Sequence, residues 1–324
     1  MCGAVTDQLI DSTARLVGAS VRRAGFDTLV SFRSCLFARC ESPLLKLKFP
    51  DESAPAGSPL PNYDSPPVVE TSLGVQFEGL ADFRTLKVAS LWDKFRSQYP
   101  KLEEVEPLAP SFETFGHRSS AIIGPKFELM SMPPQPRFFF INENESELVQ
   151  FQKDRLAFNW RRRGDAPYPR YTHIRERFEA AFAALTEWAA EEGLGTPEPN
   201  QSEAIYVNIV PLTDASGSDC GLSHYFPWLG NDLIGMTEDG LFQFRRRLEN
   251  EGGDPVARLN FQLQYGTDEE SARKARLHLH VRGRPTTNTF EDALALVDAG
   301  REIIVRTFAA ITSAEAADIW ERQE

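Results

Sequence analysis

Two histidines lie two residues apart in the last quarter of the chain. His278 and His280 belong to the stretch RLHLHVR, in which Leu277, Leu279 and Val281 take the alternate positions. This alternation predicts a strand with both imidazoles on one face, about 7 Å apart. Two imidazoles at this spacing could ligate a metal ion or share acid–base work if carboxylates met them. Because no HExxH or Cys/His spacing accompanies them, we expect no metal site and favour two histidines on a partly solvated sheet face.

Neutral polar side chains recur along the predicted strands, opposite their apolar positions. The set is Gln150, Gln152, Asn159, Asn208, Asn260, Gln262 and Gln264, with His278 and His280. Amides and imidazoles suit a face that is half covered and must satisfy a partner, such as a lid loop, a ligand or another chain. The pattern leaves two interpretations open, which are a functional groove and a covered structural face.

Arginines and aromatic residues gather in the stretch WRRRGDAPYPRY, residues 160–171. It precedes a predicted helix, and guanidinium groups near a helix N-terminus can bind an anion while aromatic rings stack on a base. We therefore assign Arg161, Arg163, Tyr168 and Arg170 as candidate contact residues. The alternative is that these arginines pair with nearby acids such as Glu176.

Alternating and helical periods locate the elements that must position these side chains. Strands are predicted near 69–77, 137–141, 147–152, 155–161, 203–210, 241–248, 258–265 and 276–282. Helices are predicted near 86–99, 169–192 and 290–310. A short last helix is expected to begin at Thr312, which forms a capping box with Glu315. Tight links between strands and single helices between strand groups predict an α+β fold, a large mainly antiparallel sheet with helices packed on one face. Two long loops, 104–136 and 211–240, are expected to act as lids or docking surfaces, and the alternative for 211–240 is that its apolar side chains close the edge of the core.

Composition excludes several classes of function. The chain has 324 residues and a formal charge of −12, so general nucleic-acid binding is disfavoured and only a local basic patch could hold phosphate. No apolar run is long enough to span a membrane, and the four cysteines form no CxxC pair, which fits a reducing cytoplasm. Residues 1–58 are expected to be a poorly ordered N-terminal extension, and residues 59–324 a single α+β domain that could consist of two sub-halves meeting near 165–200.

Four blocks of the sequence resemble a known family. They are LPNYDSPPVVETSLGVQFEGL, SELVQFQKDRLAFNWRR, YPRYTHIRERF and ALALVDAGREIIVRTFAAITSAEAADIWER. In this order and spacing they resemble a family of uncharacterised, sporadically distributed prokaryotic proteins over about residues 59–324. The resemblance implies a cytoplasmic accessory protein of the kind found in mobile or defence-associated gene neighbourhoods. It assigns no role to any residue.

The sequence favours a non-catalytic binding or regulatory module over an enzyme. The polar sheet face would recognise a partner protein or a small anionic ligand, with no cofactor and no metal, and the chain could form a homo- or hetero-oligomer. The expected contact residues are Arg161, Arg163, Tyr168, Arg170, Asn208, Gln262, His278 and His280. The alternative is a hydrolytic or nuclease-type enzyme with a site around His278 and His280.

Overall fold

The computed structural model describes residues 59–116, 135–213, 218–230, 237–268 and 272–323. The expectation for residues 1–58 lies outside the described residues. In the described part of the chain, no helix combines the length and apolar character needed to cross a membrane.

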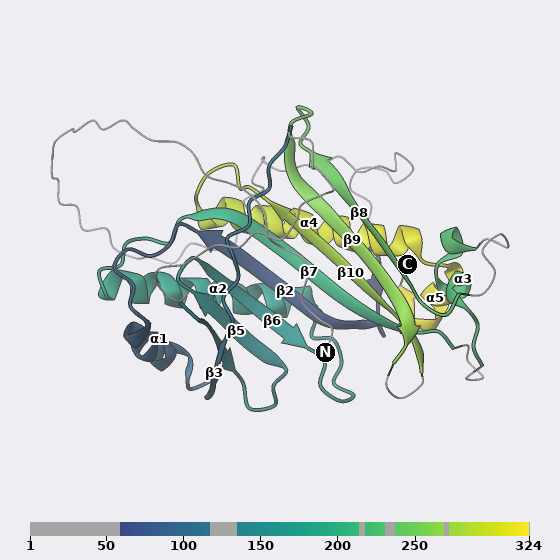
Figure 1. Cartoon of the computed structure of the whole chain (residues 1–324), viewed down its shortest axis with the longest axis horizontal. Helices are drawn as coiled ribbons and strands as arrows, with labels where there is room; N and C mark the ends of the chain where they lie inside the picture. The colour runs from purple at the N-terminus through teal and green to yellow at the C-terminus, as the bar shows by residue number, and fades with distance from the viewer. Residues whose placement is uncertain (1–58, 117–134, 214–217, 231–236, 269–271, 324) are drawn as a thin grey trace.

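One nine-stranded sheet forms the centre of the molecule, and every pair of neighbouring strands in it is antiparallel (Figure 1). Its order is β3-β4-β5-β6-β2-β7-β10-β9-β8. The strands are β2 (Val68–Phe77), β3 (Lys101–Val105), β4 (Arg137–Ile141), β5 (Glu147–Gln152), β6 (Arg155–Arg161), β7 (Pro199–Pro211), β8 (Gly240–Glu249), β9 (Pro255–Thr267) and β10 (Arg273–Gly283).

Two long helices cover one face of this sheet. The helix α2 (Arg170–Glu191) packs against β6 and β2, and α4 (Phe290–Ile311) packs against β7 and β10. Figure 1 shows both helices behind the sheet, so its opposite face, here called the open face, is turned to the viewer. The predicted α+β class, with a large antiparallel sheet and helices on one face, is confirmed.

Shorter elements complete the fold. They are β1 (Asn62–Tyr63), the 3-10 helix η1 (Thr85–Lys87), α1 (Val88–Phe95), α3 (Leu222–Tyr225), the 3-10 helix η2 (Pro227–Leu229), α5 (Ala314–Ile319) and β11 (Arg322–Gln323). The strands β1 and β11 pair with each other, which ties the first described residues to the last.

The helix α4 follows from local sequence signals and close packing. The Thr289 side chain caps its first turn by accepting a hydrogen bond from the Asp292 N–H, and its apolar stripe lies against the sheet. Gly300 allows a close approach, because a Cβ atom there would lie 3.1 Å from Val281 Cγ1. Phe290 at the start of α4 stacks on Phe182 of α2, with ring centroids 4.0 Å apart.

The strand order divides the sheet into two halves with the same path. In the first half β2 is central, a short helical segment follows, and a meander returns through β4 and β5 to β6 and then to α2. In the second half β7 is central, and the chain returns through β8 and β9 to β10 and then to α4. Both closing helices have 22 residues, and the two central strands pair with each other. The halves are therefore related by an approximate two-fold axis between β2 and β7.

The end of the chain differs from the sequence prediction. Thr312 ends α4, and it is Ser313 that caps α5 by accepting a hydrogen bond from the Ala316 N–H. The predicted capping box from Thr312 to Glu315 is therefore wrong by one residue. The Thr312 hydroxyl is used instead within α4, where it donates to the Phe308 carbonyl at 2.9 Å.

Candidate functional site

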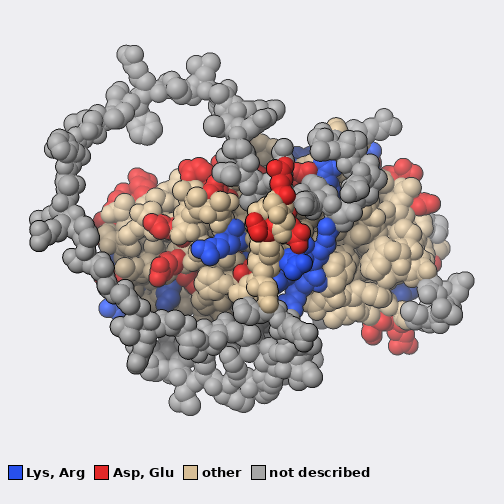
Figure 2. Space-filling view, turned by 90° about the horizontal axis from the view of Figure 1, so that it is seen from above, with Lys and Arg blue, Asp and Glu red and all other residues tan. Residues whose placement is uncertain are grey.

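The open face carries an excess of positive charge although the chain as a whole is acidic. Strand register places on it Arg137, Arg155, Arg161, Arg245, Arg247, Arg258, Arg276 and Arg282, with Lys101 and Lys274, together with the carboxylates Glu70, Glu103, Glu203 and Glu249. Figure 2, which looks from above and not onto the open face, shows basic and acidic side chains side by side near the middle of the molecule. Because positive charges crowd on this face, it favours negatively charged partners.

Residues 106–116, here called the crossing segment, lie across the open face. The segment leaves β3 and runs over the front of the sheet in Figure 1. Its contacts come from β5, β6, β2, β7, β10 and β9, and so from both halves of the molecule. Part of the loop that the sequence predicted as a lid, 104–136, thus covers the polar face.

Three glutamine side chains hold the main chain of the crossing segment. Both groups of the Gln152 side-chain amide bind Leu108. The amide oxygen accepts from the Leu108 N–H at 2.9 Å, and the amide nitrogen donates to the Leu108 carbonyl at 2.8 Å. Gln76 accepts from the Ser111 N–H at 2.9 Å, and Gln201 accepts from the Glu113 N–H at 3.1 Å. All three glutamines are buried, and they come from β5, β2 and β7. A side-chain amide offers the donor and acceptor that a peptide group needs, so this row of amides matches an extended polypeptide.

Arginines add charge-assisted contacts to the same segment. Arg155 donates to the Ala109 carbonyl at 2.9 Å, and Arg282 donates to the Ser111 hydroxyl. Arg258 makes three contacts. It donates to Glu113 Oε2 at 2.6 Å and to the Thr114 carbonyl at 3.1 Å, and its guanidinium lies 5.2 Å from the centroid of the Phe115 ring. These contacts select an acidic side chain and an aromatic ring two residues apart.

A partly buried carboxylate anchors Arg282 beneath the crossing segment. Glu203 accepts from Arg282 Nε at 2.9 Å and lies 3.0 Å from His280 Nε2. Burial would raise the pKa of the Glu203 carboxyl, but the charges of Arg282 and His280 outweigh burial and hold that pKa well below its ordinary value. Glu203 therefore stays ionised and fixes the orientation of Arg282.

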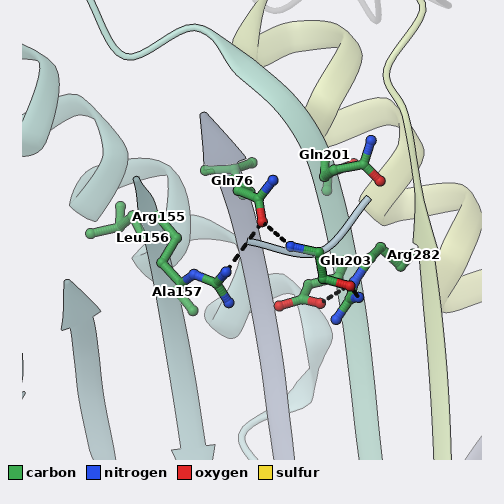
Figure 3. Close-up of a pocket in the computed structure, with 10 residues that line it drawn as sticks. Gln76, Arg155, Leu156, Ala157, Gln201, Glu203 and Arg282 are labelled. Atoms are coloured by element: carbon green, nitrogen blue, oxygen red, sulfur yellow. Dashed lines mark hydrogen bonds and ion pairs between the residues drawn. The ribbon is translucent and has the colours of Figure 1, made fainter. Parts of the chain in front are cut away.

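The space under the crossing segment is small. Figure 3 shows Gln76, Arg155, Glu203 and Arg282 pointing toward one another around it. The cavity measures about 20 Å³, which is room for roughly one water molecule and not for a small-molecule ligand. This site is thus built around the polypeptide that crosses it.

The two histidines share the open face, as their spacing predicted. Their ring centroids are 6.0 Å apart, and His280 is buried. Burial, followed by the charges of His280 and Arg276, lowers the pKa of His278 to about 4, so its imidazole is neutral at pH 7. Among the described residues, no group of three or more His, Cys, Asp or Glu side chains could hold a metal ion.

The basic and aromatic residues of 160–171 do not form one site. Arg161 lies on the open face with its Nε 3.3 Å from Glu70 Oε1, and Arg163 is exposed in the following loop. The Tyr168 hydroxyl lies 3.3 Å from that of Tyr206 on the helix-covered side. Arg170 donates to Asn62 Oδ1, the Tyr63 carbonyl and Asp64 Oδ1 at 2.8–2.9 Å. The structure disperses these residues, and Arg170 holds β1 in place.

Most of the predicted amide set shares the open face, but Asn208 does not. Register groups Gln150, Gln152, Asn159, Asn260, Gln262, Gln264, His278 and His280 on one side of the sheet. Asn208 alternates with Val207 and Ile209, lies beside Leu277 and points to the helix-covered side. The assignment of Asn208 to the polar face is therefore wrong. The reason is that β7 carries apolar residues on both faces, which hides its orientation in the sequence.

Sequence reasoning missed the residues that make most contacts with the crossing segment. Gln76, Gln201, Arg258 and Arg282 all lie on predicted strands or next to them. The alternation of β2 already placed Gln76 on the polar face, so a signal existed for it. For the others the sequence gives no sign that a segment 88 to 171 residues away would cover them.

Comparisons with known proteins give no match: no protein-family model, no curated protein and no solved structure matches this chain.

Proposed function

We propose that the chain is a non-catalytic binding module whose open face recognises an extended, acidic segment of a partner protein. The observation that supports this proposal is the crossing segment, which the open face holds mainly through main-chain contacts. A partner segment that offers the same groups would take its place. The crossing segment would then act as an internal competitor for the face.

The chemistry of the face favours a polypeptide over a small anion. The amides of Gln76, Gln152 and Gln201 hydrogen-bond to main-chain groups of the crossing segment, as they would to those of any extended polypeptide. The arginine excess favours acidic side chains. In addition, the Nε atom of Arg137 is buried and has no hydrogen-bond partner among the described residues. A buried donor without an acceptor is unfavourable, and a carboxylate would satisfy it.

A peptide supplied in trans tests the proposal. In the full chain, residues 106–116 would be replaced by a Gly/Ser segment of equal length, and a fluorescent peptide EPLAPSFETFG would be titrated by anisotropy. We expect saturable binding that Arg258→Gln weakens about tenfold, which corresponds to about 1.4 kcal/mol. Arg247→Gln is the matched control, because Arg247 lies on the same face but pairs with Glu249. No binding of the peptide up to millimolar concentration would refute the proposal.

A second candidate is an enzyme of hydrolytic type, favoured by one contact. His280 lies 3.0 Å from Glu203, which is the carboxylate–imidazole pairing that orients a general base. His280→Gln should then abolish turnover while the protein keeps its fold. Retained activity on any substrate that the wild type turns over would exclude this role.

The biological setting follows only from the family resemblance. A place in a cytoplasmic, defence-associated accessory system of a prokaryote stays a prediction.

A further inference from the structure

The two halves of the molecule differ in how their outer strands are covered. In the sheet order, β4 of the first half corresponds to β8 of the second. In the first half α1 covers the helix side of β4, where Phe95 stacks on Phe140 with ring centroids 5.4 Å apart. Both rings are buried.

In the second half the corresponding aromatic residues are exposed. The connection between β7 and β8 contains, in its described part, only the four-residue α3 and the three-residue η2. Phe244 of β8 is 47% exposed although it stacks on the buried Phe261 at 4.4 Å, and Trp228 of η2 is 45% exposed. Trp228 also packs edge-on against Phe242, with centroids 5.8 Å apart. Adjacent exposed aromatic rings of this kind mark interaction surfaces.

A cation without an acidic partner lies on the same side of β8. Arg246 alternates with Phe244 and is partly buried. Burial lowers the pKa of its guanidinium, and no carboxylate contacts it among the described residues. A partly desolvated guanidinium gains most from a carboxylate brought by a partner.

We infer that one surface, here called the β8 patch, is a docking site for an amphipathic helix of a partner protein. The patch consists of Trp228, Phe242, Phe244 and Arg246. The partner helix carries a carboxylate beside its apolar stripe. The first half of the molecule shows what this position accepts. There Val88, Leu91 and Phe95 of α1 are buried, and Phe95 contacts Phe140 of β4. The partner helix would occupy the same place on β8, with its carboxylate on Arg246.

Charge disfavours a second copy of the chain as the occupant. A two-fold interface repeats every residue, so two copies of Arg246 would enter one apolar contact. Neither copy would bring a carboxylate from the β8 patch, and two like charges would be desolvated together. An acidic helix avoids this repulsion. The β8 patch lies on the helix side of the sheet, so this inference does not depend on the proposed function of the open face.

A designed helix gives a direct test. The probe is a fluorescein-labelled peptide with the sequence of residues 85–99 in which Lys87→Glu, Lys94→Glu and Arg96→Glu make it acidic. We expect saturable binding to the full chain by anisotropy, and binding at least ten times weaker for the unmodified, basic peptide. This preference would be diagnostic, because the chain as a whole, with a charge of −12, repels an acidic peptide.

Variants of the β8 patch locate the interaction. Phe244→Ser should weaken binding of the acidic peptide at least tenfold, and Arg246→Gln should remove the preference for the acidic peptide. Leu102→Ser is the matched control, because Leu102 is 38% exposed on the opposite edge strand β3. An unchanged melting temperature of Phe244→Ser ensures that the loss is local. Absence of binding, binding that survives Phe244→Ser, or Phe244-dependent dimers in light scattering would each overturn the inference.

Discussion

Glu203 is the residue on which the geometry of the open face depends most. It orients Arg282 at 2.9 Å, and Arg282 in turn holds the Ser111 hydroxyl of the crossing segment. Its side chain is 23% exposed and that of Arg282 is 15% exposed, so water screens the pair only partly. Removal of Arg282 leaves the partly buried charge of Glu203 with less compensation, from His280.

We predict that Arg282→Gln lowers the free energy of unfolding by about 2–3 kcal/mol at pH 7, below the range of fully buried pairs because of the partial exposure. The pH dependence gives a second signature. The pKa of folded Glu203 is depressed, so its stabilising contribution is present above the ordinary pKa of 4.5 and is lost as pH falls below it. Wild type should therefore lose more stability than the variant between pH 5 and pH 3. Urea unfolding at these pH values measures both effects, and equal losses would contradict the assigned pairing.

Residue types alone could not separate binding side chains from structural ones. Arg170 and Tyr168 are residue types that often line anion-binding sites. In the structure, however, Arg170 binds β1 and Tyr168 lies against Tyr206. Their roles depend on β1 and β7, which lie far away in the sequence. The histidines were predictable as a pair because their orientation depends only on the local alternation of β10.

At the scale of elements, segments with a regular hydrophobic period were predicted well from the sequence, whereas irregular segments were not. The helices α2 and α4 and eight of the nine sheet strands were expected near their observed positions. The strand β3, with the sequence KLEEV, was missed because three of its five residues are charged. The crossing segment has no period at all, and its path depends on partners such as Arg258, which lies 145 residues after Glu113. No local pattern can encode such contacts.

The packing of α4 on the sheet gives a prediction at the same scale. Replacing a helix-interior glycine by alanine normally stabilises a protein by about 1 kcal/mol. At Gly300 the new methyl group would lie 3.1 Å from Cγ1 and 3.2 Å from Cβ of the buried Val281. Because Val281 is stiff and has no room to move, we expect Gly300→Ala to destabilise the fold by about 1–2 kcal/mol.

The same substitution in a chain that also carries a change at Val281 separates the steric clash at Gly300 from the gain in helix propensity. In a Val281→Ala chain Cγ1, the closer of the two atoms, is gone while Cβ stays at 3.2 Å, so Gly300→Ala should destabilise the fold less there than in the wild-type background. Thermal melts of the four chains provide the comparison. A higher melting temperature of Gly300→Ala in the wild-type background would show that α4 does not approach the sheet as closely as described.

On the scale of the whole molecule, the approximate two-fold arrangement explains where contacts are made. The two halves pair through β2 and β7, and the crossing segment of the first half reaches β9 of the second. The open face combines basic side chains with side-chain amides that hydrogen-bond to main-chain groups, although the chain as a whole has a formal charge of −12. The β8 patch lies where the second half has no counterpart of α1 among the described residues.

The central claim is that the open face recognises an extended acidic polypeptide, and a double-mutant cycle tests it most directly. The cycle combines Arg258→Gln in the chain that lacks its own crossing segment with Glu113→Gln in the EPLAPSFETFG peptide, with affinities measured by calorimetry. Because the two side chains lie 2.6 Å apart, we predict a coupling free energy of at least about 1 kcal/mol, well above the roughly 0.3–0.5 kcal/mol by which independent sites deviate from additivity. Additive effects of the two substitutions, or a peptide that does not bind at all, would contradict the claim.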